Sequence, residues 1–438
     1  MTSDPSPRDT PEDAPKEAYV WVWLPGSTDP VVAGRLERDG GRLIFNYGRS
    51  YLDRRDAISI YEPELPLKHG AIPPQAGLAI AGCLRDGAPD AWGRRVIMNR
   101  LLGAKGRDAD IGALDELSYL LASGSDRIGA LDFQSSPGDY MPRTAQTATM
   151  EELLSAAEKV ERGVPLTPGL DQALFHGSSL GGARPKALIE DGKRKLIAKF
   201  SSSTDTYNVV KAEYLAMRLA AKTGLDAAPV RLERVAGKDV LLVERFDREK
   251  GPDGWKRKAM VSALTLFGLD EMMARYASYE DLAEIVRHRF TAPKATLHEL
   301  FARLTFNILC SNTDDHARNH AAFWDGKGLT LTPAYDICPQ NRTGNEASQA
   351  MAITGDKRLS NLATCLEAAP HFQLDARQAE EIAAIQIETV GKHWNETCDE
   401  AALNEIDRRL LGTRMFLNPF IFEGAPDKLA RMKDRIDA

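Results

Sequence analysis

The segment SNTDDHARNH, residues 311–320, holds two acids, two histidines, one arginine and two asparagines within ten positions. It directly follows FARLTFNILC, residues 301–310, whose apolar side chains predict a buried helix. A helix end needs one capping interaction, and this segment supplies far more polar groups than a cap requires. The sequence therefore predicts a site with a chemical role at the end of a buried helix.

The composition is that of an ordinary globular protein. The 438 residues suffice for two or three domains, and 43% are hydrophobic and 27% charged. A net charge of −7 argues against a nucleic-acid-binding surface over the whole chain. No apolar run is long enough to span a bilayer, so no membrane partner is expected. Residues 1–17 lack the apolar core of a secretory signal, and their Pro and Asp content predicts a disordered leader.

The cysteines give no sign of a disulfide or zinc framework. Their number is odd, and none forms a C-x-x-C pair. They are Cys83, Cys310, Cys338, Cys365 and Cys398. We interpret them as small buried residues in a reducing compartment, which predicts a cytoplasmic protein.

The order of hydrophobic patterns predicts an α+β protein. Residues 18–150 read as a β-rich and then helical unit, in which short runs such as AISIYE (57–62) predict strands. Residues 151–250 read as strands with one strong helix, and residues 251–438 as mostly helical. A β-rich lobe followed by a helical lobe leaves a cleft between them, where ligands prefer to bind.

The acids around the opening segment have the spacing that phosphoryl transfer requires. Asp314 and Asn319 are spaced D-x-x-x-x-N, like the acid and the metal-binding asparagine of protein-kinase catalytic loops. Asp336 follows an extended run, and Mg²⁺ prefers hard oxygen ligands such as those of Asn319 and Asp336. Asp314 is then left to accept the proton of a hydroxyl. The spacing alone also occurs by chance, and a polar loop with Asx turns is the alternative.

Upstream residues could bind phosphates. In the loop Ser178–Lys186, between segments predicted to be extended, Gly181 and Gly182 let backbone amides approach an anion, although a hairpin turn fits equally. Lys199 ends the apolar strand KLIAKF, and Glu213 on the next helix could pair with it, as in protein kinases. A solvated surface position is the alternative for both side chains.

Two further features could contact a nucleotide. The apolar strand in VLLVERFDR runs into Glu244, Arg245 and Phe246, which at a lobe junction could offer backbone groups and an aromatic ring to adenine. A strand ending in surface charges is the alternative. His316 could contact a phosphate or be a structural histidine.

Together, GGARPKALI, LLVERFDR, NTDDHARNHAAF and LTPAYDI resemble the HipA family of bacterial serine/threonine kinases, the toxin components of HipBA-type toxin–antitoxin modules. The resemblance covers about residues 19 to 420. It implies a bilobal, protein-kinase-like fold with a small mixed N-terminal subdomain and a helical C-terminal lobe.

The resemblance also implies ATP and Mg²⁺ as cofactors and a role for each matching residue. Asp314 is the implied catalytic acid, Asn319 and Asp336 hold Mg²⁺, and Lys199 contacts the ATP phosphates. The implied nucleotide contacts are Gly181, Gly182, Ala183, Arg184, Pro185 and Lys186 over the phosphates, Glu244, Arg245 and Phe246 along the adenine, and His316 in the catalytic loop.

The phosphate loop also carries an implied regulatory site. Ser179 matches the serine that family members autophosphorylate, and the neighbouring Ser178 is the alternative. Added phosphate would place negative charge where the ATP phosphates must bind, which explains inhibition. The loop departs from some toxins in having Arg184 and Pro185 where those toxins have Gln and Glu.

Three functions are therefore open. The first is a protein kinase, and the resemblance implies an aminoacyl-tRNA synthetase as its substrate. The second is a corepressor that binds a HipB-like helix-turn-helix antitoxin and reaches DNA only through that partner. The third is a kinase for lipids or small molecules, which the lack of a membrane segment or a basic amphipathic helix disfavours.

Overall fold

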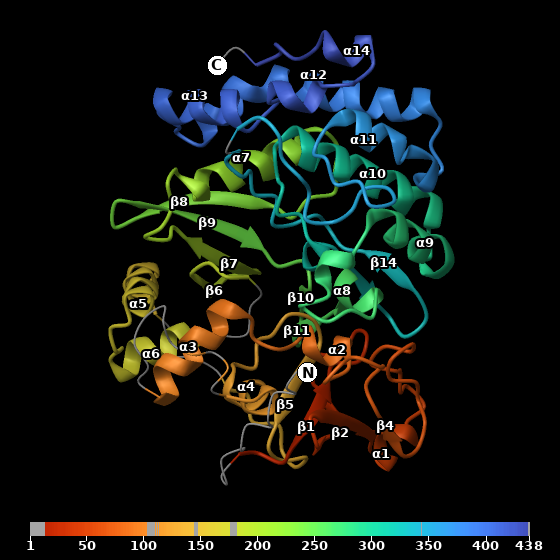
Figure 1. Ribbon diagram of the computed structural model, residues 1–438. Coiled ribbons are helices and arrows are strands. Elements are labelled where there is room, and N and C mark those ends of the chain that lie inside the picture. Colours follow the sequence, from red (N-terminus) through yellow and green to blue (C-terminus); the bar gives the residue numbers. More distant parts are fainter. Residues whose placement is uncertain are drawn as a thin grey trace, which may run out of the picture.

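A computed structural model describes residues 14–102, 110, 112, 114–143, 148–175, 182–342 and 344–436. Figure 1 shows three layers of structure along the molecule. The N-terminal sheet lies at one end, a four-stranded sheet lies in the middle, and the helices of the C-terminal half lie at the other end. None of the helices in this part of the chain is long and apolar enough to cross a membrane.

The N-terminal sheet is antiparallel, with the strand order β4-β3-β2-β1-β5. Its strands are β1 (Glu17–Val22), β2 (Val31–Asp39), β3 (Arg42–Tyr47), β4 (Ala71–Ile72) and β5 (Leu131–Gln134). Gly40 has a φ of 57° in the turn between β2 and β3, a conformation that glycine adopts without steric strain. β1 begins within the predicted leader, of which residues 1–13 lie outside the described part.

The predicted strand at residues 57–62 is wrong. Side chains, rather than a neighbouring strand, hold its backbone. Tyr51 Oη donates to Ile58 O at 2.7 Å, and Trp324 Nε1 donates to Ser59 O at 2.9 Å. The segment is apolar because it is buried beneath the C-terminal half, and burial without sheet pairing gives the same sequence pattern as a strand.

Helices cover both faces of the middle sheet. The sheet has the order β6-β7-β9-β8 and consists of β6 (Lys186–Asp191), β7 (Arg194–Phe200), β8 (Val230–Val235) and β9 (Lys238–Glu244). Its side chains alternate, so Val240 and Leu242 pack into the cluster of α3 (Ala91–Leu102), α5 (Met150–Arg162) and α6 (Pro168–Phe175). Leu241 and Val243 face the opposite way, where α7 (Val209–Lys222) packs.

The C-terminal half is mainly helical but includes strands that sequence patterns missed. The missed strands are β10 (Arg248–Gly251) and β11 (Gly254–Arg257), which form a hairpin, and β12 (Ala259–Ser262). β12 joins the hairpin of β13 (Ala321–Trp324) and β14 (Leu329–Leu331), a hairpin that the sequence AAFWDGKGLTL does indicate. The remaining α-helices are α1 (Arg49–Leu52), α2 (Gly82–Arg85), α4 (Glu116–Ala122), α8 (Ala263–Leu266), α9 (Tyr279–Arg289), α10 (Pro293–Leu309), α11 (Leu362–Glu367), α12 (Ala376–Glu400), α13 (Glu405–Arg414) and α14 (Asp427–Ala430). Helix α12 packs on α7 and so joins this half to the middle sheet.

All five cysteines are free. Four are buried and Cys338 is partly exposed, so the expectation of small buried residues is confirmed for four of them.

Candidate active site

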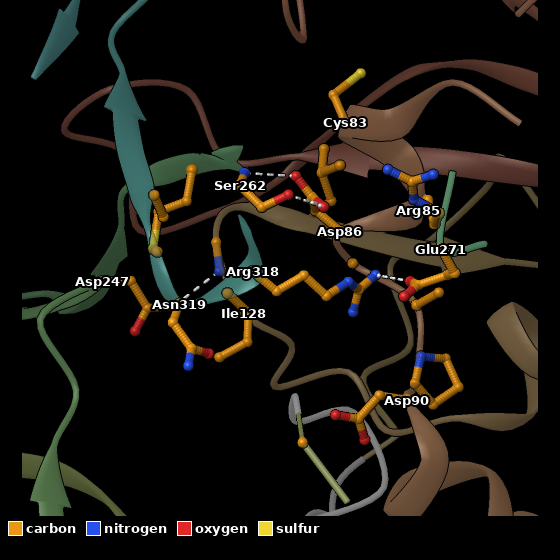
Figure 2. A pocket seen from close by; sticks show the side chains of 18 of the residues that line it. Cys83, Arg85, Asp86, Asp90, Ile128, Asp247, Ser262, Glu271, Arg318 and Asn319 are labelled. Atoms are coloured by element: carbon orange, nitrogen blue, oxygen red, sulfur yellow. Dashed lines mark hydrogen bonds and ion pairs between the residues drawn. The ribbon is translucent and has the colours of Figure 1, made fainter. Parts of the chain in front are cut away.

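A cavity of about 810 Å³ lies where the N-terminal region, the middle sheet and the helical half meet. Figure 2 shows it with Asp90, Arg318 and Asn319 among the side chains around it. Ten of the residues predicted to bind nucleotide or metal line it: Gly182, Ala183, Lys186, Lys199, Glu244, Arg245, Phe246, His316, Asn319 and Asp336. The cavity also extends beneath the N-terminal region, along Ile58, Leu78 and Ile128.

The segment 311–320 connects α10 to β13 and is fixed by buried polar groups. Ser311 has a φ of 57° and donates through Oγ to Met415 O at 2.5 Å. Asp315 is buried and contacts His320 Nε2 at 3.0 Å, while Tyr279 Oη donates to its other oxygen. Burial alone would raise the pKa of Asp315, but the pairing with His320 lowers it below the ordinary value. These buried contacts fix the backbone that carries Asp314.

Asp314 is exposed and lies beside the cavity wall rather than in it. Its backbone carbonyl accepts a hydrogen bond from Asn319 Nδ2 at 3.3 Å. Partial desolvation at the edge of the cavity raises the pKa of Asp314 above its ordinary value; His316 opposes that shift, and the Asp336 carboxylate adds to it. An accessible carboxylate with a raised pKa is suited to accept a proton from a hydroxyl group.

Lys199 on β7 joins three elements. Its Nζ lies 2.5 Å from Glu213 Oε1 on α7 and also pairs with Asp336 Oδ1 in the segment after β14. Burial opposes the charge of Lys199, but Asp336 and Glu213 together raise its pKa above the ordinary value. Burial would raise the pKa of Asp336, but Lys199 lowers it to about 2. The predicted pairing of Lys199 with Glu213 is therefore confirmed, and Asp336 is ionised.

Asp336 also has an unusual backbone. Its φ of 58° lies in the left-handed region, which aspartate tolerates better than most side chains do. Such conformations are often found at functional sites, where the surrounding structure maintains them. The conformation directs one carboxylate oxygen to Lys199.

The described part of the phosphate loop begins at Gly182, whose φ is 98°. Lys186 begins β6 and is buried at the cavity wall. Arg184 Nη1 pairs with Asp205 Oδ1 at 2.6 Å, and neither Arg184 nor Pro185 lines the cavity. Helix α6 precedes the loop where the sequence suggested an extended segment, since its apolar residues pack against α3 and α5. Gly181, Ser178 and Ser179 lie outside the described residues.

The segment Glu244–Phe246 forms the cavity wall between the lobes. Phe246 packs against Phe323 and Tyr335, with ring centroids 5.9 and 5.6 Å apart. The Arg245 guanidinium points into a buried network and donates to Asp247 Oδ2 at 2.8 Å. The Arg245 side chain therefore has a structural role, and only the backbone of this residue is available to a ligand in the cavity.

Sequence reasoning missed two groups of residues at this site. Tyr279 and His320 hold Asp315; His320 lies in the segment 311–320, whereas Tyr279 carries no local signal that distinguishes it from other buried residues. Asp90 and Arg318 also line the cavity, and Arg318 Nη2 pairs with Glu271 Oε1 at 2.8 Å. Asp90 precedes the catalytic segment by more than two hundred residues, so only the folded structure brings them together.

The donor set at the cavity fits Mg²⁺. Asp336 is ionised, and Asn319, whose Nδ2 is engaged with Asp314 O, has an amide oxygen to offer. Mg²⁺ in phosphoryl-transfer sites takes one or two protein oxygens and fills its other positions with phosphates and water. Among the described residues no group of three or more His, Cys, Asp or Glu could hold a metal ion by itself.

The chain is similar to proteins of one family over most of its length. Residues 22–134 match the family model for the HipA N-terminal domain, and residues 178–394 match the HipA-like C-terminal domain. A Sinorhizobium fredii protein whose name describes a kinase is 26% identical over 344 residues, which are 72% of this chain and 76% of that protein. The serine/threonine-protein kinase toxin HipA of Shewanella oneidensis is 26% identical over 200 residues, which are 40% of this chain and 46% of that one.

The fold has a solved counterpart. The structure of the Shewanella oneidensis HipA, HipB and operator DNA complex contains a chain with a TM-score of 0.67 and 18% identity, covering 96% of this chain and 97% of that chain. The expected α+β, kinase-like fold is confirmed. From both family models and these relatives, the chain belongs to the HipA family and is a protein kinase of the serine/threonine type.

Proposed function

We propose that the protein uses ATP and Mg²⁺ to phosphorylate a hydroxyl group of another protein and of its own phosphate loop. The observation that carries this proposal is Lys199, which is held between Glu213 and Asp336 at the cavity wall. A strand lysine between a helix glutamate and a metal-binding aspartate is the arrangement with which protein kinases hold ATP phosphates. The role of each site residue is part of this proposal, as is the division of the chain into units that meet near residues 150 and 250.

In this proposal each group has one role. Asp314 accepts the proton of the acceptor hydroxyl, and Lys199 contacts the phosphates. Asn319 and Asp336 hold Mg²⁺, which would neutralise charge that develops on the transferring phosphoryl group. Phe246 and the neighbouring backbone would contact the adenine at the cavity wall.

Ser179, with Ser178 as the alternative, is the proposed site of autophosphorylation. Both precede Gly182, which lines the cavity together with two lysines. A phosphate on either serine would compete with ATP for the same positive charges, so the modified protein should be inactive.

The direct test is intact mass after incubation with ATP and Mg²⁺, in the wild type and in Asp314→Ala. We expect one added phosphate in the wild type alone, mapped by peptide sequencing to Ser179 or Ser178. The starting mass is measured first, because a chain already phosphorylated in the expression host would gain nothing. An unmodified chain that gains no phosphate and shows no thermal shift with ATP would refute the proposal.

A second proposal concerns a partner. The matched Shewanella oneidensis chain was solved with HipB and operator DNA, and its fold covers 96% of this chain. We infer that this protein binds a HipB-like helix-turn-helix antitoxin and reaches DNA through it. Co-purification with a small helix-turn-helix protein encoded beside it tests this. Asp314→Ala should retain the complex, because Asp314 serves only catalysis.

The substrate is the least constrained part of the proposal. An aminoacyl-tRNA synthetase is the class that the family resemblance implies. Incubating the unphosphorylated kinase with labelled ATP and a panel of purified synthetases would identify it. Transfer of label to phospholipid vesicles or to small hydroxyl compounds, but to no protein, would favour a lipid or small-molecule kinase instead.

A further inference from the structure

Helix α3 of the N-terminal region holds the described part of the phosphate loop through three carbonyl groups. The Trp92 backbone N–H lies 3.4 Å from Gly182 O, and the Trp92 indole Nε1 donates to Lys186 O at 3.1 Å. Arg95 Nη2 donates to Ala183 O at 3.3 Å. One helix, from a different part of the chain, therefore determines the position of both ends of this stretch.

Asp90, immediately before α3, brings a buried charge to the same place. Both of its carboxylate oxygens are enclosed, and neither accepts a hydrogen bond of ordinary geometry from the described residues, although the backbone N–H groups of Trp92 and Gly93 at the start of α3 favour its charged form. Figure 2 shows Asp90 at the cavity with no interaction marked to it. A buried carboxylate without such partners is unfavourable unless another charge compensates it.

Lys186 is the compensating charge nearest the loop. Burial raises the pKa of Asp90 to about 6, and Lys186 is the strongest influence in the opposite direction, followed by Arg318. A Cβ built on Gly182 would collide with Lys186 Nζ and would lie 3.9 Å from Asp90 Oδ2, so both groups converge on this glycine. Gly182 thus leaves the space in which the ammonium and the carboxylate approach each other.

The two lysines of the cavity therefore differ in the carboxylate that influences each most strongly. Lys186 on β6 lies directly opposite Lys199 on β7, so their side chains share one face of the sheet. Lys199 is engaged by Glu213 and Asp336. Burial lowers the pKa of Lys186, and the Asp90 carboxylate is the largest influence opposing it.

We propose that Asp90 is a positioning residue for nucleotide binding, whose carboxylate holds the Lys186 ammonium at the phosphate loop, so that the N-terminal region completes the ATP site. This inference rests on the proposed function. It assigns the N-terminal region a role in binding phosphates. Binding of the nucleotide's phosphates should depend on Asp90, whereas binding of its adenine should not.

The test compares binding of ATP and adenosine by the wild type and by Asp90→Asn, which keeps the shape of the side chain and removes its charge. We expect the dissociation constant for Mg²⁺–ATP to rise roughly tenfold, the usual effect of one charge-assisted interaction, while adenosine affinity stays unchanged. In steady-state kinetics of Asp90→Asn, the KM for ATP should rise while kcat stays unchanged. Asp56→Asn, at an exposed aspartate of the same region paired with Arg54, is the control and should change neither constant.

Arg95→Gln gives a second variant. It removes the bond to Ala183 O, together with a long bond to Ala91 O within α3, and should raise the KM for ATP by a smaller factor. Equal ATP affinity in the wild type and Asp90→Asn would overturn the inference and leave the proposed function intact. Equal losses of ATP and adenosine affinity would indicate a structural role and also overturn it. A folded wild type that binds no ATP would overturn the proposed function and this inference together.

Discussion

The catalytic segment 311–320 and the phosphate loop stretch 182–186 meet in one cavity but are held in different ways. The segment is fixed from within the C-terminal half, by Met415 through Ser311 and by Tyr279 through Asp315. The loop stretch is held from outside, by α3 of the N-terminal region.

This difference separates two kinds of kinetic effect. Changes around the segment should alter the chemical step, because they move Asp314 relative to the acceptor hydroxyl. Changes around the loop should alter nucleotide affinity, because they move the charges that face the phosphates. If substitutions in either region changed kcat and the KM for ATP equally, the two regions would not have these separate roles.

The largest effect is expected at Asp314. Asp314→Ala removes the proton acceptor and should reduce kcat by roughly 10²- to 10⁴-fold, the range for general base catalysis. ATP affinity should be unchanged, because Asp314 does not line the cavity. Phosphate transfer to a protein substrate and isothermal titration with ATP measure the two quantities. A variant that also loses ATP binding would show that Asp314 is part of the nucleotide site.

The next effect is expected at the ion pairs of Lys199. Lys199→Met leaves Glu213 buried without its cation, and breaking a buried pair destabilises a protein by about 3 kcal/mol. Chemical denaturation measures the free energy of unfolding. Lys238→Met is the matched control, because Lys238 pairs with Glu158 at the surface, where the loss should be under about 1 kcal/mol. Equal losses in both variants would contradict the buried pairing.

A smaller effect is expected at Tyr279, which supports the catalytic segment through Asp315. Tyr279→Phe removes the hydroxyl donor to buried Asp315 and should destabilise the fold by about 1–3 kcal/mol. It should lower kcat with little change in the KM for ATP, the reverse of Asp90→Asn. Tyr276→Phe, at an exposed tyrosine, is the control. A raised KM with an unchanged kcat would mean that Tyr279 supports the nucleotide site instead.

The acidic side of the pH profile tests the environment of Asp314. Its pKa is raised, so protonation of the base should begin at a higher pH than the ordinary carboxyl value of about 4. Activity should be full at neutral pH and should fall about tenfold per pH unit once the pH is below that raised value. Measuring kcat at saturating ATP, with circular dichroism to confirm folding, gives the profile. A flat kcat down to about pH 4 would exclude a raised pKa for the base.

The sequence predicted the parts of the site that local patterns encode. Asp314 and Asn319 are five positions apart in one segment, so the spacing of the motif constrains how far apart they can lie. Lys199 and Glu213 lie on β7 and α7, which follow each other along the chain. The sheet around Lys199 follows from alternating apolar residues and a clear turn between β6 and β7. The strong helical period of α7 predicted the helix that carries Glu213, while a solvated face stayed open for this residue, and the structure shows it buried.

Contacts between distant segments could not be predicted in this way. Asp90 lies near Lys186 only because α3 docks on the middle sheet, and no pattern in either segment specifies that docking. Strand β12 was missed because four residues are too few to establish a period. The role of Arg245 was assigned to the adenine, while its guanidinium proved to be buried among Asp126 and Asp247.

The smallest effect is expected at Arg184, and it tests how far the loop extends into the nucleotide site. Arg184 was expected to contact phosphates, but in the structure it pairs with Asp205 and does not line the cavity. A partly exposed pair of this kind contributes little, so Arg184→Gln should change the free energy of unfolding by less than about 1 kcal/mol and the KM for ATP by less than about twofold. Asp90→Asn provides the internal comparison in the same assay. If Arg184→Gln raised the KM as much as Asp90→Asn, Arg184 would have to leave Asp205 and turn to the phosphates when ATP binds. The loop would then be held by the nucleotide as well as by α3, and the contrast with the catalytic segment would apply only before ATP binds.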